Sequence, residues 1–449
     1  MAAPRPGFRR NAAEVFFARA MIVVMSLALN VLVNRLLSVD DRGIFALAYG
    51  LPLLLQNLAG LGMFNANVYF ASRAARMRDI VTNSLYLSVL ITVVLLLLAW
   101  PLHGVILRTV LDHVRPAHFF ILVGLMPFAF MDYFFSGALQ GVGEFRSYNA
   151  RRIVTMLTML VAFAALVGGF GLGLNGAVAA VALTIVVTGL MYLQAAVRLD
   201  GLGSRPDVAL GRKMLVYGGK SYSASTANFL SFRLDQYLLA ALAVGGSREV
   251  AIYAVAVSLA EILWYIPDSI VTVLFPRLSA TQDPGEIHAF TAQVCRVTVV
   301  VTLASAAAVA LLAQPLILLL AGHRYLPFSL WPLWLLLPGA VSMAVYKILW
   351  RNFTGRDRQR VTVSAALIAV ALNVLLNLWM IPRYGASGAA ISSSFSYTLG
   401  TVILLVVFMR DSGIGLRQTV IVSRSEVGGE WGGVRELLAR RFGGGSDRD

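Results

Sequence analysis

The chain has 449 residues, of which 58% are hydrophobic and only 13% charged, and its mean hydropathy is +0.76. Soluble domains carry about 25% charged residues, so this composition excludes a soluble globular protein and predicts a membrane protein. The single cysteine, Cys295, excludes an internal disulfide and a cysteine-built metal site. The net charge of +15 leaves a nucleic-acid partner open until the basic residues are placed along the chain.

Apolar runs of roughly 20 residues or more recur along the chain, each long enough to cross a hydrocarbon core of about 30 Å. The first run continues to Leu37, too long for the apolar part of a signal peptide, so we expect it to remain as a span. The runs predict an all-α membrane protein with twelve transmembrane helices. In chain order these are Ala13–Leu37, Ile44–Phe70, Ile80–Leu107, Phe119–Gly141, Ile153–Phe170, Gly176–Val197, Met214–Val244, Ala251–Phe275, Ala289–Leu320, Ser329–Phe353, Val361–Ile381 and Gly388–Phe408.

Basic residues separate the two sides of the predicted membrane. Most of them lie before the first span, in the loops after the even-numbered spans, or after the last span. The opposite loops hold only Arg42, Arg108, Arg115, Arg248, Arg324 and Arg383. By the positive-inside rule, we expect both termini in the cytoplasm, which accounts for the basic excess without nucleic acid. Only three of the 37 basic residues are lysines, which favours a GC-rich bacterial genome and therefore the bacterial inner membrane.

An internal repeat divides the chain into two halves. "DRGIFALA" matches "EVAIYAVA" 208 residues later, and "GLNGAVAA" matches "GASGAAIS" 212 residues later. Because each half holds an even number of spans, the six-helix repeats are parallel and enclose a central cavity, and rocking of one against the other gives alternating access. We expect an N-terminal lobe at 1–197, a cytoplasmic linker at 198–213, a C-terminal lobe at 214–409 and a cytoplasmic tail at 410–449.

Polar and basic side chains within the spans are the candidates for substrate binding. A charge near the bilayer centre costs from about 2.5 to more than 10 kcal/mol, so it is expected to face protein or water. An arginine in a wet cavity offers bidentate hydrogen bonds to phosphate. We therefore predict substrate contacts at Arg19, Lys220 and Arg233, with Asn30 and Asn228 beside them. For the asparagines, hydrogen bonding between helices is the commoner role.

Three acidic residues are the candidates for coupling to an ion: Asp235, Glu261 and Asp268. Each could serve as an ion-coupling site, as the partner of Arg233, or in a structural ion pair, and the sequence leaves these roles open. Asp235 lies two residues from Arg233, on nearly the opposite face of a helix, so a pair between these two is disfavoured.

Enzyme and cofactor motifs are missing. The chain has no GxxxxGK[ST] phosphate loop, no HExxH and no paired CxxC. "GLGLNG" lies between two spans and is predicted to be a turn, and the loops are too short to form a catalytic domain. We predict that the protein is not an enzyme and uses no cofactor and no metal.

Four stretches resemble the multidrug/oligosaccharidyl-lipid/polysaccharide (MOP) exporter superfamily, and within it the Wzx-like flippases of bacterial polysaccharide biosynthesis. They are "NRLLSVDDRGIFALA", "ALQGVGEFRSYNARR", "EVAIYAVAVSLAEILWYIPDSIVTVLFPRLSA" and "IPRYGASGAAISSSFSY". Together they lie in both halves, and the combination is more specific than any single piece.

The resemblance implies transport of an oligosaccharide linked to a polyprenyl diphosphate of the undecaprenyl type from the cytoplasmic to the outer leaflet. It also implies a proton or sodium gradient as the energy source, contact with membrane lipid, and a polysaccharide polymerase as partner. The family's basic cavity agrees with Arg19, Lys220 and Arg233 by location only. The alternatives are a lipid II flippase, a drug/cation antiporter, a major-facilitator importer and a non-transporting scaffold. The antiporter would favour an acidic cavity, and the importer would show a "GxxxDRxGRR" loop where this chain has "ASRAARMRD".

Overall fold

The computed structural model describes residues 8–73, 76–111, 114–265, 267–268, 283–356 and 358–420, and every regular element in these ranges is a helix. The N-terminal half contains α1 (Phe8–Leu36), α2 (Val39–Ala59), α3 (Met63–Ser72), α4 (Met77–Thr109), α5 (Pro116–Gly124), α6 (Met126–Gly141), α7 (Phe145–Phe163), the π-helix η1 (Ala164–Gly169) and α8 (Gly173–Asp200). The C-terminal half contains α9 (Val208–Leu242), α10 (Gly246–Ala260), the 3-10 helix η2 (Glu261–Trp264), α12 (Pro284–Leu311), α13 (Ala313–Leu320), α14 (Leu326–Gly355), α15 (Gln359–Ser412) and α16 (Leu416–Val420).

The helices in the described part of the chain fall at the twelve predicted spans, although not all of them qualify as spans by length and apolar composition. By length and apolar composition seven helices qualify, and the pair α2 and α3, bent by 62°, makes an eighth. α15 holds two spans, because its backbone breaks at Gly385, with φ 51° and ψ −129°. α1, α9 and α10 complete the set, and the polar residues of α9 explain why hydropathy alone passes over it. The predicted all-α fold of a multi-pass membrane protein is confirmed.

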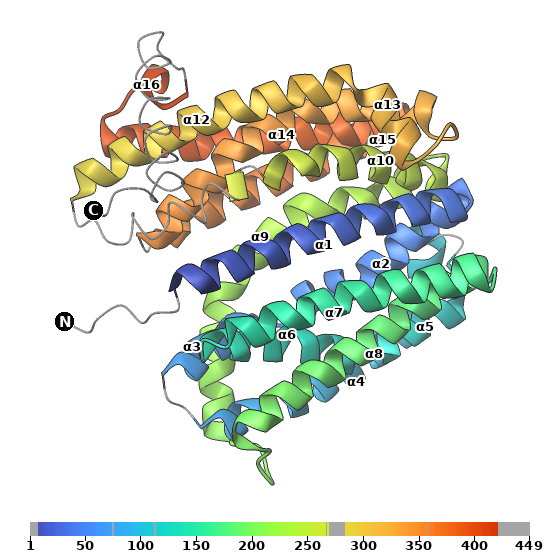
Figure 1. Ribbon diagram of the computed structural model, residues 1–449, viewed down its shortest axis with the longest axis vertical. Coiled ribbons are helices and arrows are strands. Elements are labelled where there is room, and N and C mark those ends of the chain that lie inside the picture. Colours follow the sequence, from blue (N-terminus) through green and yellow to red (C-terminus); the bar gives the residue numbers. More distant parts are fainter. Residues whose placement is uncertain are drawn as a thin grey trace, which may run out of the picture.

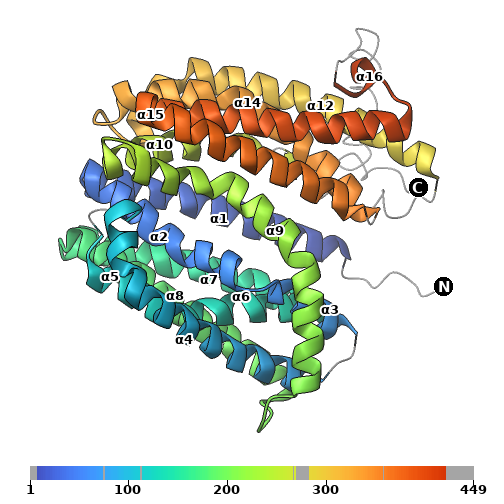
Figure 2. The same cartoon turned by 180° about the vertical axis from the view of Figure 1, so that it is seen from behind.

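The helices lie side by side in two groups (Figures 1 and 2). One group contains α4 to α8, the other contains α10, α12, α14 and α15, and α1, α2 and α9 run between them. The start of α1 and the short α16 lie at the same end of the bundle (Figure 1), which we call the terminal end. We call the opposite end, where α1 gives way to α2, the Ser38 end. The Ser38 hydroxyl caps α2 by accepting from the amide of Asp41 at 3.1 Å, so α2 begins before the predicted Ile44.

Buried apolar side chains show how the halves meet. The largest cluster contains residues of both halves at the Ser38 end, among them Leu47 of α2 and Tyr253 of α10. At the terminal end there are two separate cores: one surrounds Phe134 of the N-terminal half and includes Met214 from the start of α9, and another surrounds Phe353 in the C-terminal half. Because a shared apolar core resists separation, the two halves are closed together at the Ser38 end.

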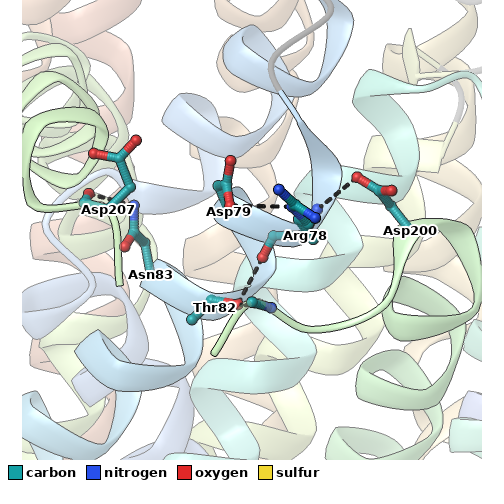
Figure 3. A network of polar contacts seen from close by, with 7 residues as sticks. Arg78, Asp79, Thr82, Asn83, Asp200 and Asp207 are labelled. Atoms are coloured by element: carbon teal, nitrogen blue, oxygen red, sulfur yellow. Dashed lines mark hydrogen bonds and ion pairs between the residues drawn. The ribbon is translucent and has the colours of Figure 1, made fainter. Parts of the chain in front are cut away.

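The connection between the halves is fastened to α4 (Figure 3). α8 ends at Asp200 and α9 begins at Val208, so only seven residues of the predicted linker are non-helical. The amide of Gly203 donates to the Thr82 hydroxyl at 2.7 Å, and the Asn83 amide group donates to the carbonyl of Asp207 at 2.9 Å. The Asp207 carboxylate caps α9 by accepting from the amide of Leu210 at 3.0 Å. The first turn of α9 is therefore held by the N-terminal half.

Candidate functional site

A cavity of about 340 Å³ lies between the two halves. Its walls come from α1, α2 and α7 of the N-terminal half and from α9, α10 and η2 of the C-terminal half. Aromatic side chains form much of the wall: Phe45, Tyr49, Phe229, Tyr237 and Tyr265. Its uncharged polar side chains are Ser26, Asn30, Gln236 and Ser258. An apolar wall with a few polar groups is the usual composition of a small-molecule site.

Two arginines and one glutamate supply the charges among the described residues of the cavity wall: Arg233, Glu261 and Arg42. The wall therefore carries one positive charge in excess. Arg233 of α9 and Glu261 of η2 form an ion pair with 3.5 Å between Nη2 and Oε1. Their side chains are 38% and 27% exposed, so the pair is hydrated and its net stabilisation is small, about 1 kcal/mol or less. The Arg233 guanidinium therefore keeps donors for a further anion.

Arg42 is a cavity residue that the sequence placed in an outer loop. It lies in the first turn of α2, is only 5% exposed, and donates from Nε to Oδ1 of Asn34 at 2.9 Å. The only indication in the sequence was the position of Arg42 at the boundary of an apolar run. Arginines in solvent-exposed loops occupy the same kind of position, so this did not identify a cavity residue. The surroundings of Arg42 are set by tertiary packing: Asn34 of α1, its hydrogen-bond partner, bonds in turn to Leu320 of α13, far away in the chain.

The predicted substrate residues fall in different places. Asn30 and Arg233 line the cavity, whereas Lys220 is exposed on α9 and does not line it. Asn30 donates to the carbonyl of Ser26, one turn earlier in the same helix, at 3.0 Å. Arg19 lies in α1 and Asn228 in α9, but both side chains lie outside the described part of the structure.

Asp235 lies behind the cavity wall in a buried polar network of the C-terminal half. Its carboxylate is 1% exposed and accepts from the hydroxyls of Tyr253 and Ser393, the latter at 3.0 Å. Asn373 extends the network by donating to Ser393 at 3.4 Å, and Asn377 donates to Asn373 at 2.9 Å. The Oδ1 atom of Asn377 is buried without a hydrogen-bond partner. The network thus holds one carboxylate and a spare amide oxygen, and oxygen ligands of this kind suit a hard cation.

Asp268 forms a different pair. Its Oδ2 atom lies 3.0 Å from Nζ of Lys347, and this ammonium also lies 5.1 Å from the ring centroid of Trp264. Glu261 and Asp268 each face a basic side chain, whereas among the described residues Asp235 forms no ion pair. No group of three or more His, Cys, Asp or Glu side chains suited to a metal occurs in the described ranges.

The Ser38 end carries a seam between the halves. α2 and α10 approach so closely at Gly43 that a Cβ there would lie 1.7 Å from the carbonyl oxygen of Ser247. Asn34 donates to the carbonyl of Leu320 at 3.3 Å, and Arg35 donates to the carbonyl of Leu319 at 2.9 Å. We call these contacts the Ser38 seam. They hold the two halves together at that end.

At the terminal end, α9 makes a second contact with the N-terminal half. Gly62, with φ +69°, marks the bend between α2 and α3, and a Cβ there would lie 2.1 Å from the carbonyl oxygen of Gly218. Tyr217 stacks on Tyr69 with 4.1 Å between ring centroids. The glycines allow α9 to lean on the N-terminal half while its later turns pack in the C-terminal half.

Comparison with known proteins gives a family and a fold. A family model described as polysaccharide biosynthesis protein matches residues 9–282, more than half of the chain. No curated protein sequence gives a significant match.

Three solved structures with a similar fold are distant in sequence, at 14 to 16% identity. The lipid II flippase MurJ in an inward closed conformation is 14% identical, with a TM-score of 0.74 over 98% of this chain and 93% of that chain. A multidrug resistance MATE family transporter of the MOP superfamily, in an inward-facing conformation, is 16% identical, with a TM-score of 0.68 over 87% of this chain and 94% of that chain. An outward-facing MATE structure is 14% identical, with a TM-score of 0.59 over 90% and 95%.

Proposed function

The chain belongs to the polysaccharide biosynthesis protein family of the MOP superfamily, and on this premise we propose that it is a flippase for a lipid-linked oligosaccharide. Its substrate is an oligosaccharide on a polyprenyl diphosphate of the undecaprenyl type, moved from the cytoplasmic to the outer leaflet of a bacterial inner membrane. The observation that carries the proposal is the cavity between the halves, with two arginines against one glutamate on its described wall. A diphosphate complements this charge, whereas an organic cation does not.

The mechanism that we propose is alternating access between two lobes, residues 1–197 and 214–409. The terminal end faces the cytoplasm, as the distribution of basic residues favours. The shared apolar core at the Ser38 end and the separate cores at the terminal end fit an inward state, closed to the outside. Opening of the Ser38 seam then gives the outward state. A polysaccharide polymerase that consumes the exported substrate is the partner that we infer.

The proposal is tested by reconstituting the purified chain in liposomes that carry labelled lipid in one leaflet. We expect transfer of an undecaprenyl-diphosphate oligosaccharide to the other leaflet, at a rate at least about tenfold above that in empty liposomes. Lipid II and a fluorescent organic cation serve as competing substrates. Transfer of the cation without any transfer of the diphosphate lipids would show an antiporter and overturn the proposal. Faster transfer of lipid II than of the oligosaccharide would show a lipid II flippase.

We further propose Asp235 as the residue that couples transport to a proton or sodium gradient, because Glu261 and Asp268 are occupied by basic partners. Asp235→Asn keeps the shape of the side chain and one acceptor oxygen, but it replaces the other oxygen with an NH2 donor and removes the charge. We expect this variant to lose about tenfold or more of gradient-driven transport while it binds substrate as the parent does. The measurement compares transport with and without an imposed gradient of each ion.

Asp268→Asn is the matched control for Asp235→Asn, since it removes the same charge from a carboxylate already paired with Lys347. We expect it to retain the response to the gradient. An Asp235→Asn variant that responds to both gradients as the parent does would refute the assignment. Equal losses in both variants would point to a general effect of lost charge.

A further inference from the structure

The structure assigns a second role to a residue outside the predicted site: we propose that Arg42 binds the anionic group of the substrate at the Ser38 end of the cavity, and that this binding releases the Ser38 seam. The inference rests on the proposed function, because it takes the diphosphate as the ligand. Its new element is a physical connection between occupancy of the cavity and opening of the outer side.

The first step of the argument is the charge balance of Arg42. The residue is 5% exposed and forms no ion pair among the described residues. The neighbouring carboxylate of Asp41 accepts from the Ser38 hydroxyl at 2.7 Å. Arg42 also lies in the first turn of α2, where the positive end of the helix dipole repels a cation. A buried charge without a counterion is costly, and this cost falls when an anion enters the cavity.

The second step is the geometry of Asn34. Its Oδ1 atom accepts from Nε of Arg42 at 2.9 Å, and its Nδ2 atom donates to the carbonyl of Leu320, across the Ser38 seam, at 3.3 Å. The side chain is 3% exposed. Because an amide group has a donor on one side and an acceptor on the other, the bond to Arg42 orients the bond to Leu320. Arg42 thus positions a contact that holds the two halves together.

The third step is competition for Nε. A phosphate binds a guanidinium most strongly through two parallel N–H donors, and one of the favoured pairs includes Nε. A diphosphate that takes this pair displaces Oδ1 of Asn34, so the amide loses its orientation and the bond to Leu320 weakens. Arg233 contacts Glu261 instead, and within the described ranges it forms no bond that leads to the seam. The two arginines therefore have different roles: Arg233 binds the anion, and binding of the anion at Arg42 weakens the Ser38 seam.

The test measures affinity and seam opening separately on the full chain in lipid nanodiscs. Farnesyl diphosphate is the probe, and farnesol is the uncharged comparison. Calorimetry gives the dissociation constant, and amide hydrogen exchange of α13 reports the seam, because Leu319 and Leu320 lie in α13. In the parent chain we expect binding of the diphosphate only, together with faster exchange in α13.

Arg42→Ala is expected to weaken diphosphate binding by about tenfold to hundredfold, the range for one charge-assisted contact, and to abolish the exchange response at saturating probe. Arg42→Lys keeps the positive charge but lacks the paired N–H donors of a guanidinium. We expect its affinity for the diphosphate to lie between those of the parent and of Arg42→Ala. Arg42→Gln, which keeps a donor for Asn34 but no charge, repeats the test if the alanine variant does not fold. Arg248→Ala is the matched control, since Arg248 is an exposed arginine at the same end that does not line the cavity.

The outcomes separate this inference from the proposed function. If Arg42→Ala binds as the parent does while Arg233→Ala does not, the role of Arg42 is overturned and the anion site stands. An α13 response that persists in Arg42→Ala at saturating probe also overturns it. If the parent does not distinguish farnesyl diphosphate from farnesol, both the inference and the proposed substrate class fail.

Discussion

Arg233→Ala is expected to abolish most export and to build up the lipid-linked oligosaccharide on the cytoplasmic side. The guanidinium lies in the cavity wall and is 38% exposed, and its contact with Glu261, at 3.5 Å, is longer than a good charge-assisted hydrogen bond of about 2.7 to 2.9 Å. It is therefore free to exchange this partner for a phosphate. Loss of a charge-assisted bidentate contact costs about 1.5 to 3 kcal/mol, which corresponds to roughly tenfold to hundredfold in affinity.

The measurement is complementation of a gene deletion, with surface polysaccharide and the lipid-linked pool scored at matched protein levels in the membrane. Arg233→Lys is expected to restore part of the export, because it keeps the positive charge but lacks the two parallel N–H donors of a guanidinium. Glu261→Gln is the control: it removes the competing carboxylate, so we expect substrate affinity equal to or above that of the parent. Normal export by Arg233→Ala would show that the arginine is structural and that another residue supplies the anion contact.

Gly43→Ala is expected to prevent closure of the Ser38 seam and thereby to stop transport. The added Cβ would lie 1.7 Å from the carbonyl oxygen of Ser247, and this neighbour is backbone that cannot rotate away. α2 and α10 must then separate, which breaks the apolar core shared by the halves at this end. Overpacking of this kind costs about 1 to 3 kcal/mol, enough to shift the balance between inward and outward states by about fivefold to hundredfold.

Two measurements check this prediction: export at matched protein levels, and labelling of a cavity thiol from outside the cell. The thiol is Ser26→Cys, in a chain whose buried Cys295 is replaced by alanine. We expect an impermeant maleimide to label it strongly only when Gly43→Ala is also present. Gly104→Ala is the matched control, since a Cβ at Gly104 meets no atom within 4 Å. Normal export with an unlabelled thiol would mean that the seam adjusts to the methyl group.

Much of the architecture was readable in the sequence. Apolar runs predicted twelve spans, and the structure has helices at all of them, apart from the part of the eighth that lies outside the described residues. Even the break at Gly385 falls in the predicted gap between the last two spans. The helix ends were less predictable: α9 starts at Val208, before the predicted Met214, because Asp207 caps it. Capping depends on one side-chain bond, which hydropathy does not register.

The candidate site was readable only in part. Arg233 and Glu261 stood out because charge within an apolar run requires a partner or water. The sequence disfavoured Asp235 as the partner of Arg233 but did not choose between Glu261 and Asp268, and the structure places Glu261 there. The sequence did not indicate Arg42 as a site residue, because a charged side chain at the end of a span is expected to face water. The burial of Arg42 is evident only in the tertiary structure, where the residue is 5% exposed.

The sequence by itself determined which segments are apolar enough to enter the membrane and that charge lies within them, and it predicted that the two halves are repeats. These properties follow from the transfer free energy of each segment and from similarity along the chain, so they require no knowledge of neighbours. The tertiary structure decided which charges meet, which of them face the cavity, and where the halves touch. Those outcomes depend on packing between helices that are as many as 286 residues apart, as Asn34 and Leu320 are. No local pattern encodes such a contact, because its energy exists only when both helices are in place.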